Sequence, residues 1–443
     1  MLLMILWALA VPAQDPPFDG AQDKSEAGAK VAVEALVDAV AKVDPARFRE
    51  GFHSRRMMEE LGAKGWPEEL STGEQRAEFV EKLERSLGRA PAQLRSMGML
   101  WTGARVTRVN VAGGKAEAEV FAWVRTGEEK SLYRFWVAKD GDTWKVYDFE
   151  EQAEGLRVSF ILSALLQEAG DKKAFSRLAE TAALLQGAVK KAAAGELEAA
   201  LGQLREASKQ RLPAMFDGYL DMMEGGFLVT LGREEEALLA LDRALGKRQD
   251  LARAWQLKGE ACHALERYED CIRAHGEYLK RVGDDPHAWL QIGLSHKEAG
   301  HREDAVAALR KGIAADDEEF RNRFELAKLL AEDRKPEEAK TLFLAAFERE
   351  GEQDDLYAEA AEALMAGDAP GLLLDLARDQ AKRRGGDPDA ALLLHEGHAL
   401  RRLGKHDEAV KSLRAGLAAD TDEEHGSALR SEERRVERVY VLV

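Results

Sequence analysis

Small side chains recur along this chain at intervals of 34 residues, and this register limits the fold more than any other feature of the sequence. One phase of the register places small residues at Ala237, Cys271, Ala305 and Ala339. A second phase holds Gly225, Gly259, Gly293 and Ala327, and both phases return at Gly397 and Ala409. A fixed period of this length is typical of an α-solenoid, in which each pair of helices buries its apolar face against the next pair.

Each repeat is expected to be two helices joined by a tight turn. In one copy the helices are predicted at 252–265 and 268–281. Glycine recurs in the turns at Gly232, Gly300 and Gly404, where it supplies the left-handed conformation that ends a helix. Acidic residues follow each turn, and the dipole of the second helix favours negative charge there.

This pattern resembles the tetratricopeptide repeat family. The resemblance rests on the aromatic, glycine and small residues of two successive copies: Trp255, Gly259, Tyr268, Cys271, Tyr278, Trp289, Gly293, Ala305 and Gly312. Good copies span 218–250, 252–285, 286–319, 320–353 and 390–420, a weaker one 354–388 with Leu373 at a small position, and an upstream one 181–213. The resemblance implies about seven repeats within 181–420 and a scaffold that binds a protein or peptide.

In the family, positions 2, 5, 9, 12 and 13 of each first helix line a concave groove, when Gly259 is counted as position 8. On this chain those positions hold Tyr219, Met222, Arg253, Gln256, Glu260, His263, His287, Leu290, Leu294, Lys297, Arg321, Phe324, Lys328, His398, Arg401 and Arg402. We call this set the groove residues. Their cations favour an acidic or C-terminal-carboxylate peptide. The alternative is a solvated surface with no dedicated ligand.

Residues 25–170 have a different pattern. Apolar residues at helical spacing predict helices at 27–43, 46–61 and 72–87, and another at 155–166. Between them the period changes to two, which predicts strands at 104–111, 115–126, 130–139 and 143–150 joined by short glycine-containing turns. The whole chain is therefore expected to be mainly α, with a small α+β domain of helices on a four-stranded antiparallel sheet before the solenoid.

The end of this domain, Trp144-Lys-Val-Tyr-Asp148-Phe, resembles the nuclear-transport-factor-2-like superfamily, with its cystatin-like cone-shaped sheet, and the periplasmic phospholipid carriers of the toluene-tolerance type. The resemblance implies a curved sheet that can hold an apolar or lipid ligand. The candidates for its lining are Phe121, Trp123, Tyr133, Phe135 and Trp136. The alternative is that these side chains pack under the helices.

Charge and the chain ends bound the partners and the compartment. The 443 residues carry a formal net charge of −17, which disfavours binding to nucleic acid. The uncharged segment Met1–Ala13 is too short to span a bilayer and predicts a cleaved export signal, followed by a linker at 14–24. The charged tail 421–443 resembles artefactual sequence ends, and Val439–Val443 is expected to be strand-like.

No pattern of catalytic residues stands out. His395 and His398 could ligate a metal, but no third ligand is evident, so neither a metal nor a cofactor is expected. Asp148 and Tyr133 could form an acid–base pair in the cone, and His53 is expected to be a surface or capping residue. Cys262 and Cys271 face each other across one predicted hairpin, and they are expected to be either a disulfide or two small buried side chains.

The sequence therefore predicts an exported, non-enzymatic scaffold that binds a protein through its repeats. A carrier of an apolar ligand in residues 25–170 is the alternative, and an enzyme in that domain is a third hypothesis. The oligomeric state is not indicated.

Overall fold

The computed structural model describes residues 25–62, 66, 70–87, 89, 91–92, 95, 100–111, 116–126, 129–152, 157–168, 172–210, 216, 218–317, 319–350, 354–384, 390–419 and 426–441. The predicted export signal and the linker before residue 25 lie outside them. The chain divides into two compact units. The first comprises the residues up to Glu266 with Lys280–Gly283, and the second comprises Arg267–Leu279 and the residues from Asp284 onward.

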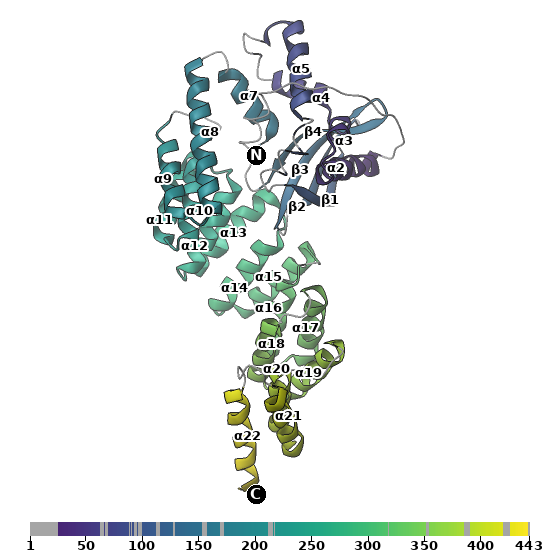
Figure 1. Cartoon of the computed structure of the whole chain (residues 1–443), viewed down its shortest axis with the longest axis vertical. Coiled ribbons are helices and arrows are strands. Elements are labelled where there is room, and N and C mark those ends of the chain that lie inside the picture. The colour runs from purple at the N-terminus through teal and green to yellow at the C-terminus, as the bar shows by residue number, and fades with distance from the viewer. Residues whose placement is uncertain are drawn as a thin grey trace. The chain divides into compact units, whose positions relative to one another are not determined.

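The first unit begins with the predicted α+β domain (Figure 1). Its helices are α2 (Ser25–Ala41), α3 (Pro45–Glu50), α4 (Ser54–Gly62), α5 (Gly73–Leu87) and α7 (Val158–Glu168). Its strands are β1 (Trp101–Val111), β2 (Glu117–Thr126), β3 (Glu129–Asp140) and β4 (Thr143–Glu151). The strands pair in the order β1-β2-β3-β4, and every pairing is antiparallel, which confirms the expected meander.

Helix α2 contacts all four strands and supplies the apolar layer that buries one face of the sheet. Val33, Leu36, Val37 and Val40 are at most 1 % exposed and occur at helical spacing, so they form one stripe. The segment before α4 extends the sheet, because His53 donates through its N–H to Val146 O at 2.7 Å and Gly51 O accepts from Val146 N at 2.9 Å. The sheet thus has a covered face with one contiguous core.

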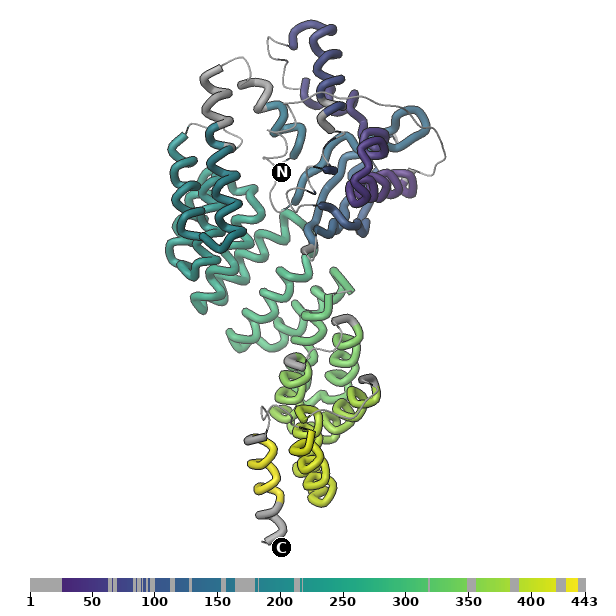
Figure 2. The backbone as a smooth tube through the Cα atoms, viewed as in Figure 1, coloured from purple at the N-terminus to yellow at the C-terminus, as the bar shows by residue number. Residues whose placement is uncertain are grey.

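Helix pairs follow in both units (Figure 2). In the first unit they are α8 (Lys172–Ala193), α9 (Leu197–Ala207), α10 (Tyr219–Thr230), α11 (Glu234–Lys247) and α12 (Ala252–Ala264). Those assigned mainly to the second unit are α13 (Tyr268–Val282), α14 (Pro286–Glu298), α15 (Arg302–Ala315), α16 (Arg321–Glu332), α17 (Pro336–Glu350), α18 (Asp354–Ala366), α19 (Pro370–Arg384), α20 (Ala390–Arg402), α21 (His406–Ala419) and α22 (Gly426–Val441).

The small positions explain how each pair closes. A Cβ atom added to Gly293 would lie 2.8 Å from Leu309 Cγ, and one added to Gly397 would lie 2.5 Å from Leu413 Cγ. Both leucines are fully buried, so a side chain on either glycine would displace a packed residue of the second helix. No helix in the described part of the chain is long and apolar enough to cross a membrane.

The tail differs from the expectation. Residues 439–441, predicted to be strand-like, belong to α22, and Leu442 and Val443 lie outside the described residues. Leu429 and Val436 are fully buried, and α22 packs on α20 and α21. Because burial of this helical stripe stabilises the helix, it overrides the β-preference of the terminal valines.

Candidate functional site

Three of the apolar groove residues are not available to a partner. Met222 is 2 %, Leu290 5 % and Phe324 3 % exposed, and each belongs to a hydrophobic core of the repeats. Phe324 stacks edge-on against Phe343 of α17, with ring centroids 5.4 Å apart. In these three repeats position 5 therefore faces the packed interior, unlike Gln256 at position 5 of α12, and Leu294, which is half-buried, is the remaining apolar groove residue.

The groove residues of α12 form a polar strip. Arg253 donates through Nη1 to Gln256 Oε1 at 2.9 Å, and Gln256 donates through Nε2 to Glu260 Oε1 at 3.1 Å. All three are half-buried. Their spacing of three and four residues places them on one face of the helix, so each bond orients the next side chain. His263, also half-buried, lies one turn beyond this strip.

Carboxylates of the repeats neutralise most groove cations in the second unit. Lys328 lies 3.1 Å from Glu325 and 2.8 Å from Glu359 of α18. Burial opposes its charge, but the hydrogen bond to Glu359 and the charge of Glu325 raise the pKa of Lys328 above its usual value. Arg402 lies 2.6 Å from Asp368, and Arg401 pairs with Glu432.

These pairs remove much of the positive charge on which the expected preference for an acidic peptide rested. Within the described residues, Lys297 and Arg321 form no ion pair. Lys297 is half-buried near the end of α14, and Arg321 and His287 are exposed at the starts of α16 and α14. The groove is therefore mixed in charge rather than cationic.

The aromatic residues expected to line a ligand cavity lie on two different faces of the sheet. Tyr133 pairs with Ala122 and Phe135 with Val120, and all four belong to the core under α2. Phe121, Trp123 and Trp136 alternate with them and therefore face the other side. All five are at most 9 % exposed and are divided between the two faces, so they do not form one surface, and their role as a ligand lining stays a prediction.

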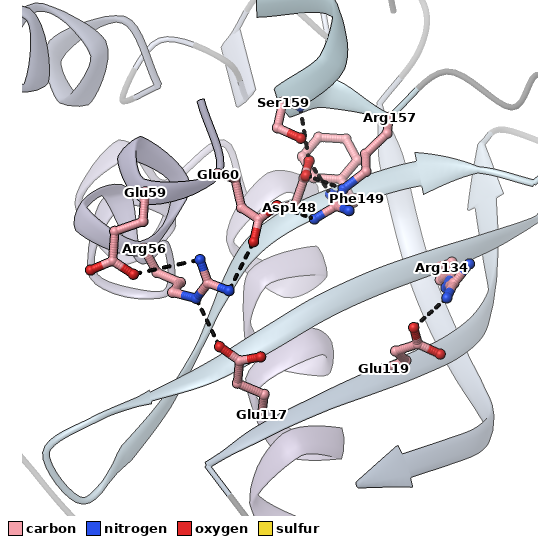
Figure 3. A network of polar contacts seen from close by, with 10 residues as sticks. All are labelled: Arg56, Glu59, Glu60, Glu117, Glu119, Arg134, Asp148, Phe149, Arg157 and Ser159. Carbon is pink, nitrogen blue, oxygen red and sulfur yellow. Dashed lines mark hydrogen bonds and ion pairs between the residues drawn. The ribbon is translucent and has the colours of Figure 1, made fainter. Parts of the chain in front are cut away.

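The second face of the sheet carries a network of ion pairs instead (Figure 3). Arg56 lies 2.8 Å from Glu60 and 2.8 Å from Glu117, and Arg157 lies 3.4 Å from Glu60. Arg134 pairs with Glu119 of the neighbouring strand. The guanidinium groups also cover the aromatic residues, since the Cζ atoms of Arg157 and Arg134 lie 4.0 and 4.5 Å from the Trp136 ring centroid.

Asp148 is the buried end of this network. Its side chain is 0 % exposed, and Oδ1 accepts hydrogen bonds from the backbone N–H groups of Phe149 at 2.9 Å and Ser159 at 3.1 Å. Oδ2 accepts from Arg157 Nε. Burial raises the pKa of Asp148 above its usual range, although the charge of Arg157 opposes this. Because the bonds from Arg157 and Ser159 join β4 to the start of α7, Asp148 holds that helix on the sheet.

The other singled-out residues also have structural partners. His53 Nδ1 accepts from the backbone N–H of Arg56 at 3.4 Å, so His53 caps α4 as expected, and burial lowers its pKa. The Tyr133 hydroxyl donates to Glu151 at 3.4 Å and belongs to the core side, so it does not pair with Asp148. His395 packs on the Tyr357 ring, whereas His398 lies 3.5 Å from Glu432, so the two histidines share no ligand position.

Cys262 and Cys271 are buried thiols in the structure. The Ser295 hydroxyl donates to Cys271 Sγ at 3.0 Å. Their pairing as a disulfide stays a prediction.

Two features of the structure were not predicted from the sequence: a buried carboxylate and a cluster of side chains with metal-binding atoms. Glu432 is buried on α22 although it belongs to a charged tail. His296, His301 and Asp304 converge at one helix turn. The available signal was the pair of histidines on either side of the Ala299-Gly300 turn.

Comparison with known proteins identifies the repeats. The family model described as tetratricopeptide repeat matches residues 286–319 and 390–423. No curated protein matches the chain. The resemblance of residues 25–170 to the cone-shaped carriers stays a prediction.

Similar solved structures include a tetratricopeptide repeat protein from Parabacteroides merdae ATCC 43184, which is 15 % identical with a TM-score of 0.40 and matches 58 % of this chain and 98 % of its own. MamA from Desulfovibrio magneticus RS-1 is 21 % identical, with a TM-score of 0.36 over 39 % of this chain and 97 % of its own. A thermophilic repeat protein of Thermus thermophilus is 22 % identical, with a TM-score of 0.34 over 42 % of this chain and 99 % of its own.

The matched segments coincide with the pairs α14–α15 and α20–α21, whose small positions are Gly293, Ala305, Gly397 and Ala409. Between them α16–α17 keeps the small positions at Ala327 and Ala339, whereas α18–α19 has Leu373 at one of them. The chain therefore carries tetratricopeptide repeats at 286–319 and 390–423.

Proposed function

We propose that the repeat array is a scaffold that binds protein or peptide partners through groove residues. The groove residues of α12 form one such surface in the first unit, and those of α14 and α16 form another in the second unit. The observation that carries this proposal is the half-buried polar strip Arg253–Gln256–Glu260, held in place by its own hydrogen bonds. Groups that are already ordered lose little conformational entropy when a partner binds. Lys297 and Arg321 add cations that no carboxylate of the described residues neutralises.

This function involves no catalysis by the chain. The polar groups of the N-terminal sheet pair with one another, and Asp148 is engaged by three donors. A carrier function is not part of this proposal, because its candidate lining divides between two packed faces. The charge balance of the groove supports a partner with polar side chains of both charges more than a purely acidic one.

The test is quantitative capture of partners by the full-length protein from an extract of its source cells. Lys297→Glu combined with Arg321→Glu is expected to lose the captured partner, because neither residue supports the core. Lys328 is avoided, since a glutamate there would add a third carboxylate beside Glu325 and Glu359. Lys411→Glu, an exposed change on the second helix α21, is the matched control.

A partner retained by the double variant at wild-type strength would refute binding through the groove residues of α14 and α16. A partner lost equally with Lys411→Glu would show an effect of charge alone.

We also propose that the protein is exported. The support is the apolar, uncharged segment Met1–Ala13, which lies outside the described residues. N-terminal sequencing of the protein from its natural source is expected to find the chain starting after residue 13. An intact N-terminal methionine would contradict export by cleavage.

A thiol count on the denatured, unreduced protein decides whether Cys262 and Cys271 form a disulfide, because two reactive thiols exclude one.

A further inference from the structure

Three side chains with metal-binding atoms converge where α14 ends and α15 begins. Each of His296, His301 and Asp304 offers one ligand atom, and these atoms all lie within 4.8 Å of one another. The imidazole rings of the two histidines are 5.9 Å apart between centroids. Glu269 of α13 is close as well, with its carboxylate 3.7 Å from His301 Nδ1.

The backbone of the turn brings the histidines together. His301 donates through its N–H to His296 O at 2.8 Å, and Gly300 donates to Lys297 O at 3.0 Å. Gly300 has a φ of 80°, so the turn is a left-handed helix cap. One bond of this motif spans five residues and here joins His301 to His296. The two residues joined by that bond commonly contact each other through their side chains as well. Asp304 follows in the first turn of α15, on the same side as His301.

Other hairpins of the array have the same turn with different side chains. The carbonyl that accepts the bond spanning five residues belongs to a leucine in four of them, at Leu228, Leu330, Leu364 and Leu400, and to Lys191 in the α8–α9 hairpin. These leucines are buried, at most 2 % exposed. A buried leucine is therefore the usual residue at this position in the later hairpins, and His296 departs from that pattern.

His296 is also poorly satisfied by the protein. Its Nδ1 atom is buried and has no hydrogen-bond partner in the described residues. Its ring contact is with His301. A buried polar atom without a partner costs roughly 1–3 kcal/mol, so the histidine lowers the stability of the hairpin unless something binds it.

We propose that His296, His301 and Asp304 bind a divalent transition metal ion of the zinc class. Two imidazole nitrogens and a carboxylate oxygen form a ligand set that such ions prefer, at about 2.0–2.1 Å from the metal. Ligand atoms around a tetrahedral ion are then about 3.4 Å apart, so the side chains must draw together from their present separation. His301 and Asp304 are exposed and can rotate to do so.

The bound metal joins the last turn of α14 to the first turn of α15. Glu269 or a water molecule completes the coordination. The site goes beyond partner binding and does not depend on it, because none of the three ligands is a groove residue.

The test is a titration of the full-length protein with ZnCl2 alone, followed by calorimetry, and metal analysis after dialysis. We expect one Zn²⁺ per chain. His301→Ala is expected to weaken binding at least about tenfold, since even outer residues of metal sites contribute that much. His296→Leu restores the residue of the other hairpins, so it should fold and lose the site. Asp304→Asn should weaken binding to a similar degree.

His287→Ala is the matched control, because His287 is an exposed histidine of the same helix outside the cluster. It is expected to leave the stoichiometry and affinity unchanged. Absence of stoichiometric Zn²⁺ binding, or binding that survives both His301→Ala and His296→Leu, would overturn the proposal. Circular dichroism of each variant separates loss of the site from loss of the fold.

Discussion

Arg401 donates a hydrogen bond through Nε to the carboxylate of Glu432, and this pair joins α22 to α20. Glu432 is 3 % exposed, and it also lies 3.1 Å from Arg435 and 3.5 Å from His398. A buried carboxylate is tolerated only when nearby charges and donors compensate its lost hydration. This ion pair therefore holds α22 on α20, and Glu432 lies on α22 between the buried residues Leu429 and Val436 in the sequence.

Removing this carboxylate should loosen α22. Glu432→Ala leaves Arg401 partly buried without its partner, and we expect a loss of roughly 2–3 kcal/mol in unfolding free energy. Urea denaturation gives the magnitude, and hydrogen exchange should show the loss concentrated in α22. Glu433→Gln is the control, because its partner Arg414 is mostly exposed and such pairs contribute at most about 1 kcal/mol. Equal effects of the two changes would contradict this account.

His398 should make the same region sensitive to acid. Burial lowers its pKa, and Arg401, Arg435 and Arg402 act in the same direction against the opposing charge of Glu432. The unfolded chain therefore binds a proton near the ordinary histidine pKa of about 6.5 that the folded chain resists. Stability is lost as the pH falls through that value, by at most about 1.4 kcal/mol per pH unit.

To check this prediction, the unfolding free energies of wild type and His398→Gln are measured from about pH 7.5 to about pH 5.5. This range is centred on the ordinary histidine pKa of about 6.5. The variant should show the smaller decline. A steeper decline than in wild type would refute it.

The helix pairs were largely predictable because the small residues that allow close helix crossing are visible as a period. Gly293 and Gly397 are positions where a Cβ atom would meet a packed leucine, and no tertiary information was needed to find them. The groove was less predictable. Lys328 pairs with Glu325 of its own helix, which the spacing of three residues allows, but also with Glu359 of another helix pair, which spacing within one repeat does not show.

The N-terminal sheet shows a similar limit. Its strands followed from the period of two, but the expected lining grouped aromatic residues by type rather than by register. Phe135 and Trp136 are neighbours in one strand and so face opposite sides, and the pairing of Phe135 with Val120 shows that Phe135 is the one that faces the core. The His296–His301 contact depends on the helix cap, and neither residue breaks the repeat pattern strongly enough to be noticed alone.

Asp148 should matter for the stability of the N-terminal domain rather than for chemistry. Asp148→Ala removes the acceptor of the Ser159 N–H and the partner of Arg157, whose side chain is only 15 % exposed. We expect a loss of roughly 3 kcal/mol or more in unfolding free energy, because a buried charge and a buried donor both lose their partner. Near-ultraviolet circular dichroism during denaturation reports the domain through Trp136, which Arg157 covers.

Asp142→Ala, an exposed change in the β3–β4 turn, should leave that transition within about 0.5 kcal/mol of wild type. A wild-type transition for Asp148→Ala would show that the network does not hold α7 on the sheet.

Gly367 tests whether the weakest repeat is as closely packed as the others. A Cβ atom there would lie 1.9 Å from the carbonyl oxygen of Ala331, and a backbone atom cannot move aside as a side chain can. Gly367→Ala should therefore destabilise the protein by about 2 kcal/mol or more. Gly371→Ala is the matched control, because nothing lies within 4 Å of its Cβ position in α19, and alanine there should be neutral or stabilise by up to about 1 kcal/mol. Thermal denaturation of both variants measures the difference, and similar melting temperatures would show that α18 can shift away from α16 without cost.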